Sequence, residues 1–169
     1  YLHRLVIEAH RNGIEVIPWF EFGFSTSYSL NGGHIIAKFP SWALKTSGGA
    51  LVVDNGFDWM SAINPEPQSY MMSLLTEVLD TYDVEGVQGD DRLPAMPVEG
   101  GYDSVTAEIY RSEHAGQAAP ANAFDAAWMK WRADKMTQFL ARVRDSVKAR
   151  GENLILAVSP TPYYWGYRE

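Results

Sequence analysis

Three charged residues at the end of a short apolar stretch are the clearest candidates for chemistry in this sequence. Asp90, Asp91 and Arg92 stand where the predicted strand 84–90 ends. Side chains alternate between the faces of a strand, so Asp90 shares a face with Gln88, and Asp91 lies on the other. A carboxylate here could be a nucleophile, a general acid or base, or a metal ligand. A turn Asp is the structural alternative, and Arg92 could be an ion partner or a substrate clamp.

A second carboxylate, Glu21, ends another apolar tract. Trp19 and Phe20 precede it and Phe22 follows it, so we expect Glu21 to be buried. A buried carboxylate needs a partner or takes a raised pKa, and a raised pKa suits a general acid. The alternative is a structural ion pair with an arginine. Two carboxylates on neighbouring strand ends are the minimal requirement for glycoside hydrolysis.

The elements that must position these acids follow from the hydrophobic periodicity. Helices and strands alternate along the chain, which predicts parallel strands joined by right-handed crossovers. The first strand is almost continuously apolar, as expected for a strand covered on both faces. The predicted helices cover 2–12, 64–82 and 125–150, and the predicted strands cover 14–22, 84–90 and 154–158.

Two long segments, 23–63 and 93–124, follow the carboxyl ends of predicted strands. Segments longer than about 15 residues without regular structure are usually functional or disordered. Active sites of α/β barrels and open α/β sheets lie at these strand ends. His34 lies in the first segment and could contact substrate, although a solvated loop histidine is equally common. Tyr102 lies in the second.

The chain is rich in aromatic residues, at 13%, with 6 Trp and 9 Tyr. Each could be a core residue or a stacking platform for a sugar ring. Helices of such folds begin near the strand ends, so we expect Trp128, Trp131 and Arg132 to lie near the site. The aromatic residues on or near the strand-end side are Trp19, Trp42, Trp59, Tyr102, Trp128, Trp131 and Trp165.

Composition excludes several classes of protein. Hydrophobic residues make up 46% and charged residues 21%, which is typical of a globular protein. The net charge of −7 argues against nucleic-acid binding. The absence of cysteine removes disulfides, zinc thiolates and cysteine nucleophiles. No nucleotide-binding motif, HExxH motif or apolar run of roughly 18 residues is present, so we expect no cofactor and no membrane span.

Several of the stretches described above resemble motifs of one known protein family. Residues 13–24 resemble a strand of the glycosyl hydrolase-like 10 family, and residues 82–92 are similar to its Tyr-Asp-Val-Asp-Gly-Ile and Asp-Asp signature. Three shorter pairs in the same order resemble that family's helix start, Trp-Arg pair and strand end: Asn64-Pro65, Trp131-Arg132 and Ser159-Pro160. Ile17 departs from the pattern, because many members carry His there.

The resemblance implies part of a (β/α)8 barrel, with about the third, fourth and fifth of its eight strands. It therefore implies that residues 1–169 form a single partial barrel domain of a longer protein, inactive by itself. It also implies action on a polysaccharide of the bacterial envelope, and an extracytoplasmic location for the full-length protein. No signal peptide is visible in this chain.

The leading hypothesis is thus a glycoside hydrolase-like barrel that requires no cofactor. Asp90 is the expected nucleophile or base, and Glu21 or Asp91 the second carboxylate. The residues expected to bind or orient substrate are Trp19, His34, Arg92, Tyr102, Trp131, Arg132 and Ser159. One alternative is a glycan-binding barrel without catalysis. Another is a metal-dependent hydrolase in which Asp90, Asp91 and Glu21 hold Mg²⁺ or Ca²⁺.

Overall fold

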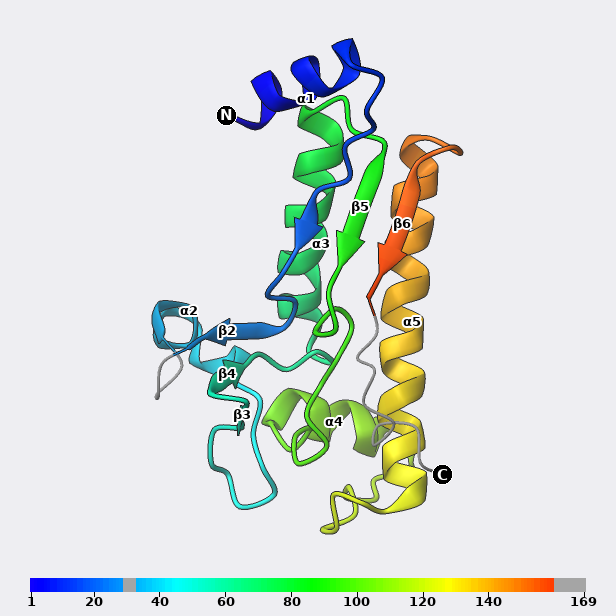
Figure 1. Cartoon of the computed structure of the whole chain (residues 1–169). Helices are drawn as coiled ribbons and strands as arrows, with labels where there is room; N and C mark the ends of the chain where they lie inside the picture. Colours follow the sequence, from blue (N-terminus) through cyan, green and yellow to red (C-terminus); the bar gives the residue numbers. More distant parts are fainter. Residues whose placement is uncertain (29–32, 160–169) are drawn as a thin grey trace.

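Two sheets organise the chain in the computed structural model, which describes residues 1–28 and 33–159 (Figure 1). Pro160 and Trp165 lie outside the described residues. The parallel sheet has the order β1-β5-β6 and consists of Trp19–Phe20, Gly86–Gly89 and Ile155–Val158. The antiparallel sheet has the order β2-β4-β3 and consists of Ser25–Ser27, Phe57–Trp59 and Val53–Asp54. The predicted parallel pairing of successive strands is confirmed.

The three predicted helices are present, and their ends follow local signals. They are α1 (Leu2–Arg11), α3 (Pro65–Thr81) and α5 (Ala126–Arg150). The side chain of Asn64 accepts a hydrogen bond from the Glu66 amide at the start of α3, and that of Asp125 accepts from the Trp128 amide at the start of α5. Each cap pairs an amide that the helix itself leaves unpaired. No helix in 1–28 or 33–159 is long and apolar enough to span a membrane.

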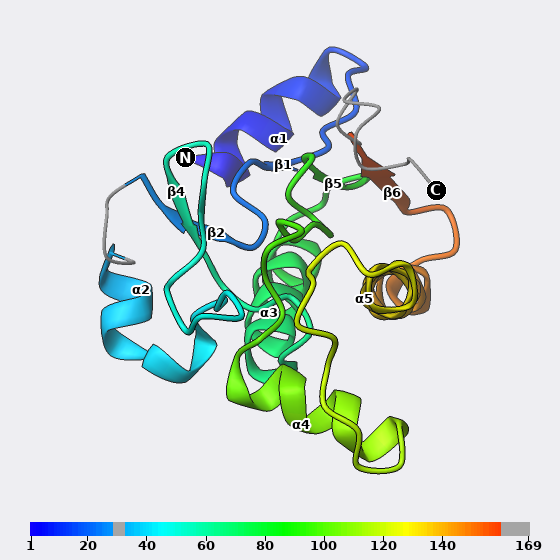
Figure 2. The ribbon, with the colours of Figure 1, turned by 90° about the horizontal axis from the view of Figure 1, so that it is seen from below.

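Strand β1 is shorter than predicted and is open on one face. Backbone pairing extends beyond its two residues, because the Glu85 amide donates to the Val16 carbonyl at 3.1 Å and the Gln88 amide donates to the Pro18 carbonyl at 2.9 Å. Pro18 has no amide proton to donate in return, as is typical of an edge strand. Helices α3 and α5 lie on the same side of the sheet (Figure 2). The expectation that both faces are covered is wrong within the described residues, where Trp19 is 59% exposed.

The two long segments contain more regular structure than the sequence predicted. The first holds the antiparallel sheet, α2 (Gly33–Lys38) and a 3-10 turn over Pro40–Trp42. The second holds α4 (Ser104–Glu113), whose N-cap, Asp103, accepts a hydrogen bond from the Thr106 amide. Both segments lie beyond the carboxyl ends of β1 and β5 (Figure 1). They therefore surround the edge of the sheet at which the acids were predicted.

The hydrophobic core joins these segments to the parallel sheet. Val87 of β5 is fully buried in the same apolar cluster as Leu75 of α3 and Val143 of α5. Phe24, which follows β1, is also fully buried and packs edge-on against Phe139 of α5, with ring centroids 5.3 Å apart. The chain just beyond β1 is therefore fixed to α5 by packing, and its backbone position is determined by the core.

We expect Phe139→Ala to lower the free energy of unfolding by about 3–5 kcal/mol, because it removes a buried ring and leaves a cavity beside Phe24. Phe124→Ala is the matched control, since Phe124 is 60% exposed, and its effect should stay within about 0.5 kcal/mol. Urea unfolding of both variants measures the difference. A similar small effect for both would show that the contact between Phe24 and α5 does not stabilise the fold.

Candidate active site

The candidate site is centred on Asp90, one residue beyond the end of β5. Gly89 pairs with Phe20 of β1, and the Asp90 amide donates to the Phe20 carbonyl at 3.3 Å. The same register places Glu21 beside Asp90, because Phe20 and Gly89 are the last paired residues and Glu21 and Asp90 follow them directly. On the other side of β5, the Ser159 amide donates to the Gly89 carbonyl at 3.0 Å. The three strand ends thus bring Glu21, Asp90 and Ser159 into one row.

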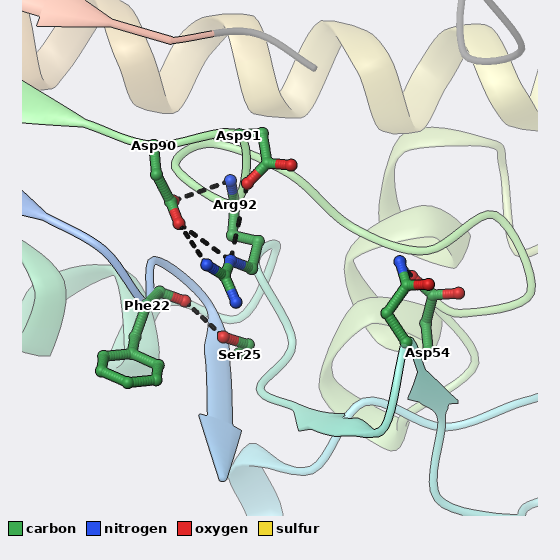
Figure 3. A network of polar contacts seen from close by, with 7 residues as sticks. Phe22, Ser25, Asp54, Asp90, Asp91 and Arg92 are labelled. Carbon is green, nitrogen blue, oxygen red and sulfur yellow. Dashed lines mark hydrogen bonds and ion pairs between the residues drawn. The ribbon is translucent and has the colours of Figure 1, made fainter. Parts of the chain in front are cut away.

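The Asp90 carboxylate is buried, with 4% of the residue exposed, and Arg92 holds both of its oxygens (Figure 3). Its Oδ1 accepts from the Arg92 amide at 2.8 Å, and its Oδ2 accepts from Nε at 2.8 Å and Nη2 at 2.7 Å. Burial raises the pKa of Asp90 above its usual value, although the hydrogen bonds and charge of Arg92 act in the opposite direction. Among the described residues Oδ1 receives a single hydrogen bond, which leaves it a lone pair for a reacting atom.

Arg92 connects this carboxylate to the neighbouring segments. Its carbonyl accepts a hydrogen bond from the Phe24 amide at 3.0 Å. Gly23 allows this approach, because a Cβ there would lie 2.0 Å from the Arg92 carbonyl oxygen. The guanidinium carbon lies 4.9 Å from the Phe57 ring centroid and 5.8 Å from that of Phe22. These contacts fix the orientation of the arginine that holds Asp90.

The other two predicted carboxylates are more accessible. The side chain of Asp91 is 48% exposed, and its Oδ1 lies 3.6 Å from Arg92 Nε. Glu21 is exposed, so the expectation that its apolar neighbours bury it is wrong. Phe20 faces the core, whereas Trp19 and Glu21 lie on the open side of the sheet. Alternation places Glu21 on the same face as Trp19, and Glu21 is exposed because α3 and α5 pack on the opposite face.

Two predicted substrate-binding residues lie on the open face or at its end. Trp19 is paired with Gln88 in the sheet and is more than half exposed. The Oγ of Ser159 accepts a hydrogen bond from Gln88 Nε2 at 2.8 Å, so these side chains meet on that same face. His34 lies instead on the short helix α2, where it is exposed. The part of the chain that the structure describes does not place His34 in contact with Asp90.

The predicted residues Tyr102 and Trp131 belong to a separate aromatic cluster around Trp128. Trp131 stacks on Trp128 with ring centroids 5.1 Å apart, and its Nε1 donates to Glu113 at 2.8 Å. Tyr102 also packs against Trp128, and its hydroxyl donates to the Pro120 carbonyl at 2.9 Å. Trp131 therefore joins α5 to α4, and Tyr102 joins α5 to the loop between these helices. A sugar contact for either side chain remains a prediction.

The position of Arg132 does not support its predicted contact with substrate. The residue is 4% exposed, and burial lowers the pKa of its guanidinium. Its Nη1 donates to the carbonyls of Val98 and Gly100 at 2.5 and 2.7 Å, and its Nη2 donates to that of Ala123 at 2.5 Å. Arg132 thus holds the two loop stretches that flank α4, which the Trp-Arg pair of the sequence could not reveal.

The metal-dependent alternative receives no support from the geometry. Within residues 1–28 and 33–159, no group of three or more His, Asp or Glu side chains is arranged to hold a metal ion. Asp90 directs both oxygens to Arg92, and a guanidinium in that position competes with any cation. The carboxylates of Asp90, Asp91 and Glu21 are therefore neighbours, but they do not converge on a common position where a metal ion could bind.

Sequence reasoning did not find the aromatic neighbours of Arg92. Phe57 lies on β4 and Phe22 follows β1, and their contacts with the guanidinium depend on the antiparallel sheet. The available signal was the Asp54-Asn55-Gly56 stretch between two short apolar runs, since Asn-Gly is a strong hairpin signal. Figure 3 shows Asp54 on this hairpin and Phe22 next to the turn that carries Asp90 and Arg92.

A parallel sheet with helices on one face is what a segment of a (β/α)8 barrel contains, and solved structures show the same fold. The chain superimposes with a TM-score of 0.67 on alpha-L-fucosidase isoenzyme 2 from Paenibacillus thiaminolyticus, at 13% identity, covering 94% of this chain and 22% of that one. The GH36 alpha-galactosidase AgaA from Geobacillus stearothermophilus gives a TM-score of 0.59, at 14% identity, covering 94% and 19%. The fold is thus part of a (β/α)8 barrel.

The chain belongs to the glycosyl hydrolase-like 10 family, whose model matches residues 1–169. It is 25% identical over 173 residues to the glycosyl hydrolase DigH of Escherichia coli K12. That match covers 94% of this chain and 35% of the relative, so the chain spans about a third of that protein's length. The family and fold predicted from the sequence are confirmed.

We expect Arg132→Met to lower the free energy of unfolding by about 3 kcal/mol, because the substitution removes the buried guanidinium that donates to four backbone carbonyls. Arg132→Lys should restore only part of this loss, since an ammonium cannot reproduce the planar fork. Arg144→Met is the matched control, because Arg144 is an exposed residue of the same helix. Thermal and urea unfolding measure the effects. Equal stability of the two Met variants would exclude the structural role of Arg132.

We expect the Asp90 carboxyl to titrate above its ordinary value of 3.8, and Arg92→Met to raise its pKa further by removing hydrogen bonds and a positive charge. Because the folded state then binds the proton more tightly, the contribution of Asp90 to stability falls as pH rises through the raised pKa. Carboxyl ¹³C NMR measures the titration. A pKa at or below 3.8 in the native protein, or no change in the variant, would contradict this assignment.

Proposed function

We propose that this chain carries the carboxylate site of a glycoside hydrolase that cleaves glycosidic bonds of a polysaccharide. The observation that carries the proposal is the buried Asp90, held by Arg92 at the carboxyl end of β5. Catalytic groups of (β/α)8 barrels lie at this edge. A carboxylate with fixed orientation and one available lone pair suits a nucleophile or a general base.

The chemistry follows from the charge that develops during cleavage. Rupture of a glycosidic bond passes through an oxocarbenium-like state, which a nearby carboxylate stabilises or attacks. The contact with Arg92 fixes Asp90 before the substrate arrives, so no reorientation is needed during the reaction. Arg92 is in this proposal a positioning residue, because its Nε and Nη2 both donate to Asp90.

Glu21 is our candidate for the second carboxylate. The register of β1 and β5 places it beside Asp90, and it lies on the open face with Trp19. Glu21 makes no hydrogen bond or ion pair within the described residues, so its carboxyl is available to give or take a proton. Asp91 is the alternative, although its nearest charged partner is Arg92 at 3.6 Å.

The substrate proposed from the family resemblance is a polysaccharide of the bacterial envelope. Two observations support a glycan: the exposed Trp19 on the open face, and membership of the glycosyl hydrolase-like 10 family. Such a substrate would place the full-length protein outside the cytoplasm. The remaining strands of the barrel would complete the cleft, so activity is proposed for the full-length protein and not for residues 1–169 alone.

We expect Asp90→Asn to lower kcat on a cleaved glycan by about a thousandfold or more, because the amide can neither attack nor accept a proton. The measurement is release of reducing ends from a panel of polysaccharides by the full-length protein. Asp145→Asn is the matched control, since it makes the same chemical change at an exposed site on α5. Glu21→Gln and Asp91→Asn are measured in parallel, and the second carboxylate is the residue whose substitution lowers kcat more.

Two results would overturn the proposal. Turnover that survives Asp90→Asn would show that Asp90 is not the nucleophile or the general base. Glycan binding by the native protein without release of reducing ends would instead indicate a glycan-binding barrel. Loss of turnover in chelator, restored by Mg²⁺ or Ca²⁺, would favour the metal-dependent alternative, whereas full activity in chelator would exclude it.

A further inference from the structure

Tyr28 is a large side chain that the structure holds in place yet leaves exposed. Its ring is packed edge-on against Phe57, with centroids 5.1 Å apart, but the residue is 76% exposed. The Tyr28 ring also packs against the β3–β4 turn, because a Cβ on Gly56 would come within 2.6 Å of it. Asn55 and Gly56 adopt φ values of 51° and 79°, which the Asn-Gly pair favours. The ring can lie this close to the turn because Gly56 has no side chain.

Phe22 continues this exposed aromatic surface toward the carboxylate site. It is 55% exposed and also packs edge-on against Phe57, with the two ring centroids 6.3 Å apart. The Arg92 guanidinium lies 4.9 Å from the same Phe57 ring and donates to Asp90. Each neighbour in the series Tyr28, Phe57, Arg92, Asp90 is thus in direct contact with the next.

We propose that Tyr28, Phe22 and Phe57 form a binding subsite for a sugar ring of the polysaccharide, away from the bond that is cleaved. The inference rests on the proposed function and names a specificity surface for it. The apolar C–H face of a pyranose matches an exposed aromatic ring, and a ring already held by packing loses little conformational entropy on binding. This trio is called the aromatic platform below.

The groups around the aromatic platform favour a sugar as the occupant over an apolar protein segment. Asp54 is exposed on the same hairpin, and Asp91 and Glu21 are exposed just beyond β5 and β1. Carboxylates accept hydrogen bonds from sugar hydroxyls, whereas they disfavour the burial of an apolar surface beside them. Phe57 of the aromatic platform contacts Arg92, and Arg92 contacts Asp90, so a polysaccharide bound to the aromatic platform would lie near the site of cleavage.

The position of the aromatic platform has a consequence for substrate length. Tyr28 reaches Asp90 only through Phe57 and Arg92, so a sugar stacked on Tyr28 is not the sugar whose bond is broken. A long oligosaccharide can occupy both places, whereas a disaccharide cleaved at Asp90 has one ring on each side of the broken bond and no third ring for Tyr28. The aromatic platform should therefore strengthen the binding of long chains and leave short ones unaffected.

The test measures binding in the full-length protein carrying Asp90→Asn, which keeps the probes intact. The probes are labelled di- and hexasaccharides of β-1,4-linked N-acetylglucosamine, glucose and xylose. We expect Tyr28→Ala to weaken hexasaccharide binding by about fivefold to tenfold and to leave disaccharide binding unchanged. Tyr28→Phe keeps the ring and should bind as the parent does. In the otherwise native protein, Tyr28→Ala should raise KM for the long chain with little change in kcat.

Phe124→Ala is the matched control, because it removes another exposed ring from the described residues, and it should change neither probe. Thermal unfolding checks that Tyr28→Ala folds normally. The aromatic platform is refuted if hexasaccharide binding survives Tyr28→Ala, if both probe lengths weaken equally, or if no probe binds the parent. Reducing-end release by the native protein and by Asp90→Asn tests the proposed function independently. The failure of the aromatic platform and the failure of the proposed function can therefore be distinguished.

Discussion

The ion pair between Asp90 and Arg92 connects the strand ends to everything that surrounds them. Arg92 donates to both carboxylate oxygens, its guanidinium lies over Phe57, and its carbonyl accepts the Phe24 amide. Phe24 in turn packs against Phe139 of α5. A single turn after β5 therefore joins the parallel sheet, the antiparallel sheet and a core helix, and the position of the candidate catalytic carboxylate depends on all three.

The two arginines predicted to contact substrate illustrate how position decides the use of the same side chain. Arg92 lies at the strand end beside a carboxylate and orients it. Arg132 of α5 donates to four backbone carbonyls, three of them in the loops that flank α4. Both are partly or wholly buried and both are hydrogen-bonded, as buried charges must be. Only the first contacts the candidate carboxylate.

The parallel sheet is open where the family fold continues. Trp19 and Ile155 are exposed on the face opposite α3 and α5, and they lie on the two outer strands. In a closed barrel this face points inward, and its carboxyl end lies at the edge where the active site forms. The chain spans 35% of the length of DigH, and the solved glycoside hydrolases are longer still relative to it. The described residues therefore leave uncovered a face that the neighbouring strands of a (β/α)8 barrel would cover.

The sequence by itself determined the features that depend on nearby residues. Asn64 and Asp125 cap their helices through amides two or three positions away, and the alternation of helices and strands predicts the parallel sheet. It also placed Asp90 at a strand end. Only the tertiary structure decided the exposure of Glu21, the burial of Arg132 and the position of Tyr28 against Gly56. Burial and side-chain contact depend on which distant segments pack together, and no local pattern of residues specifies that packing.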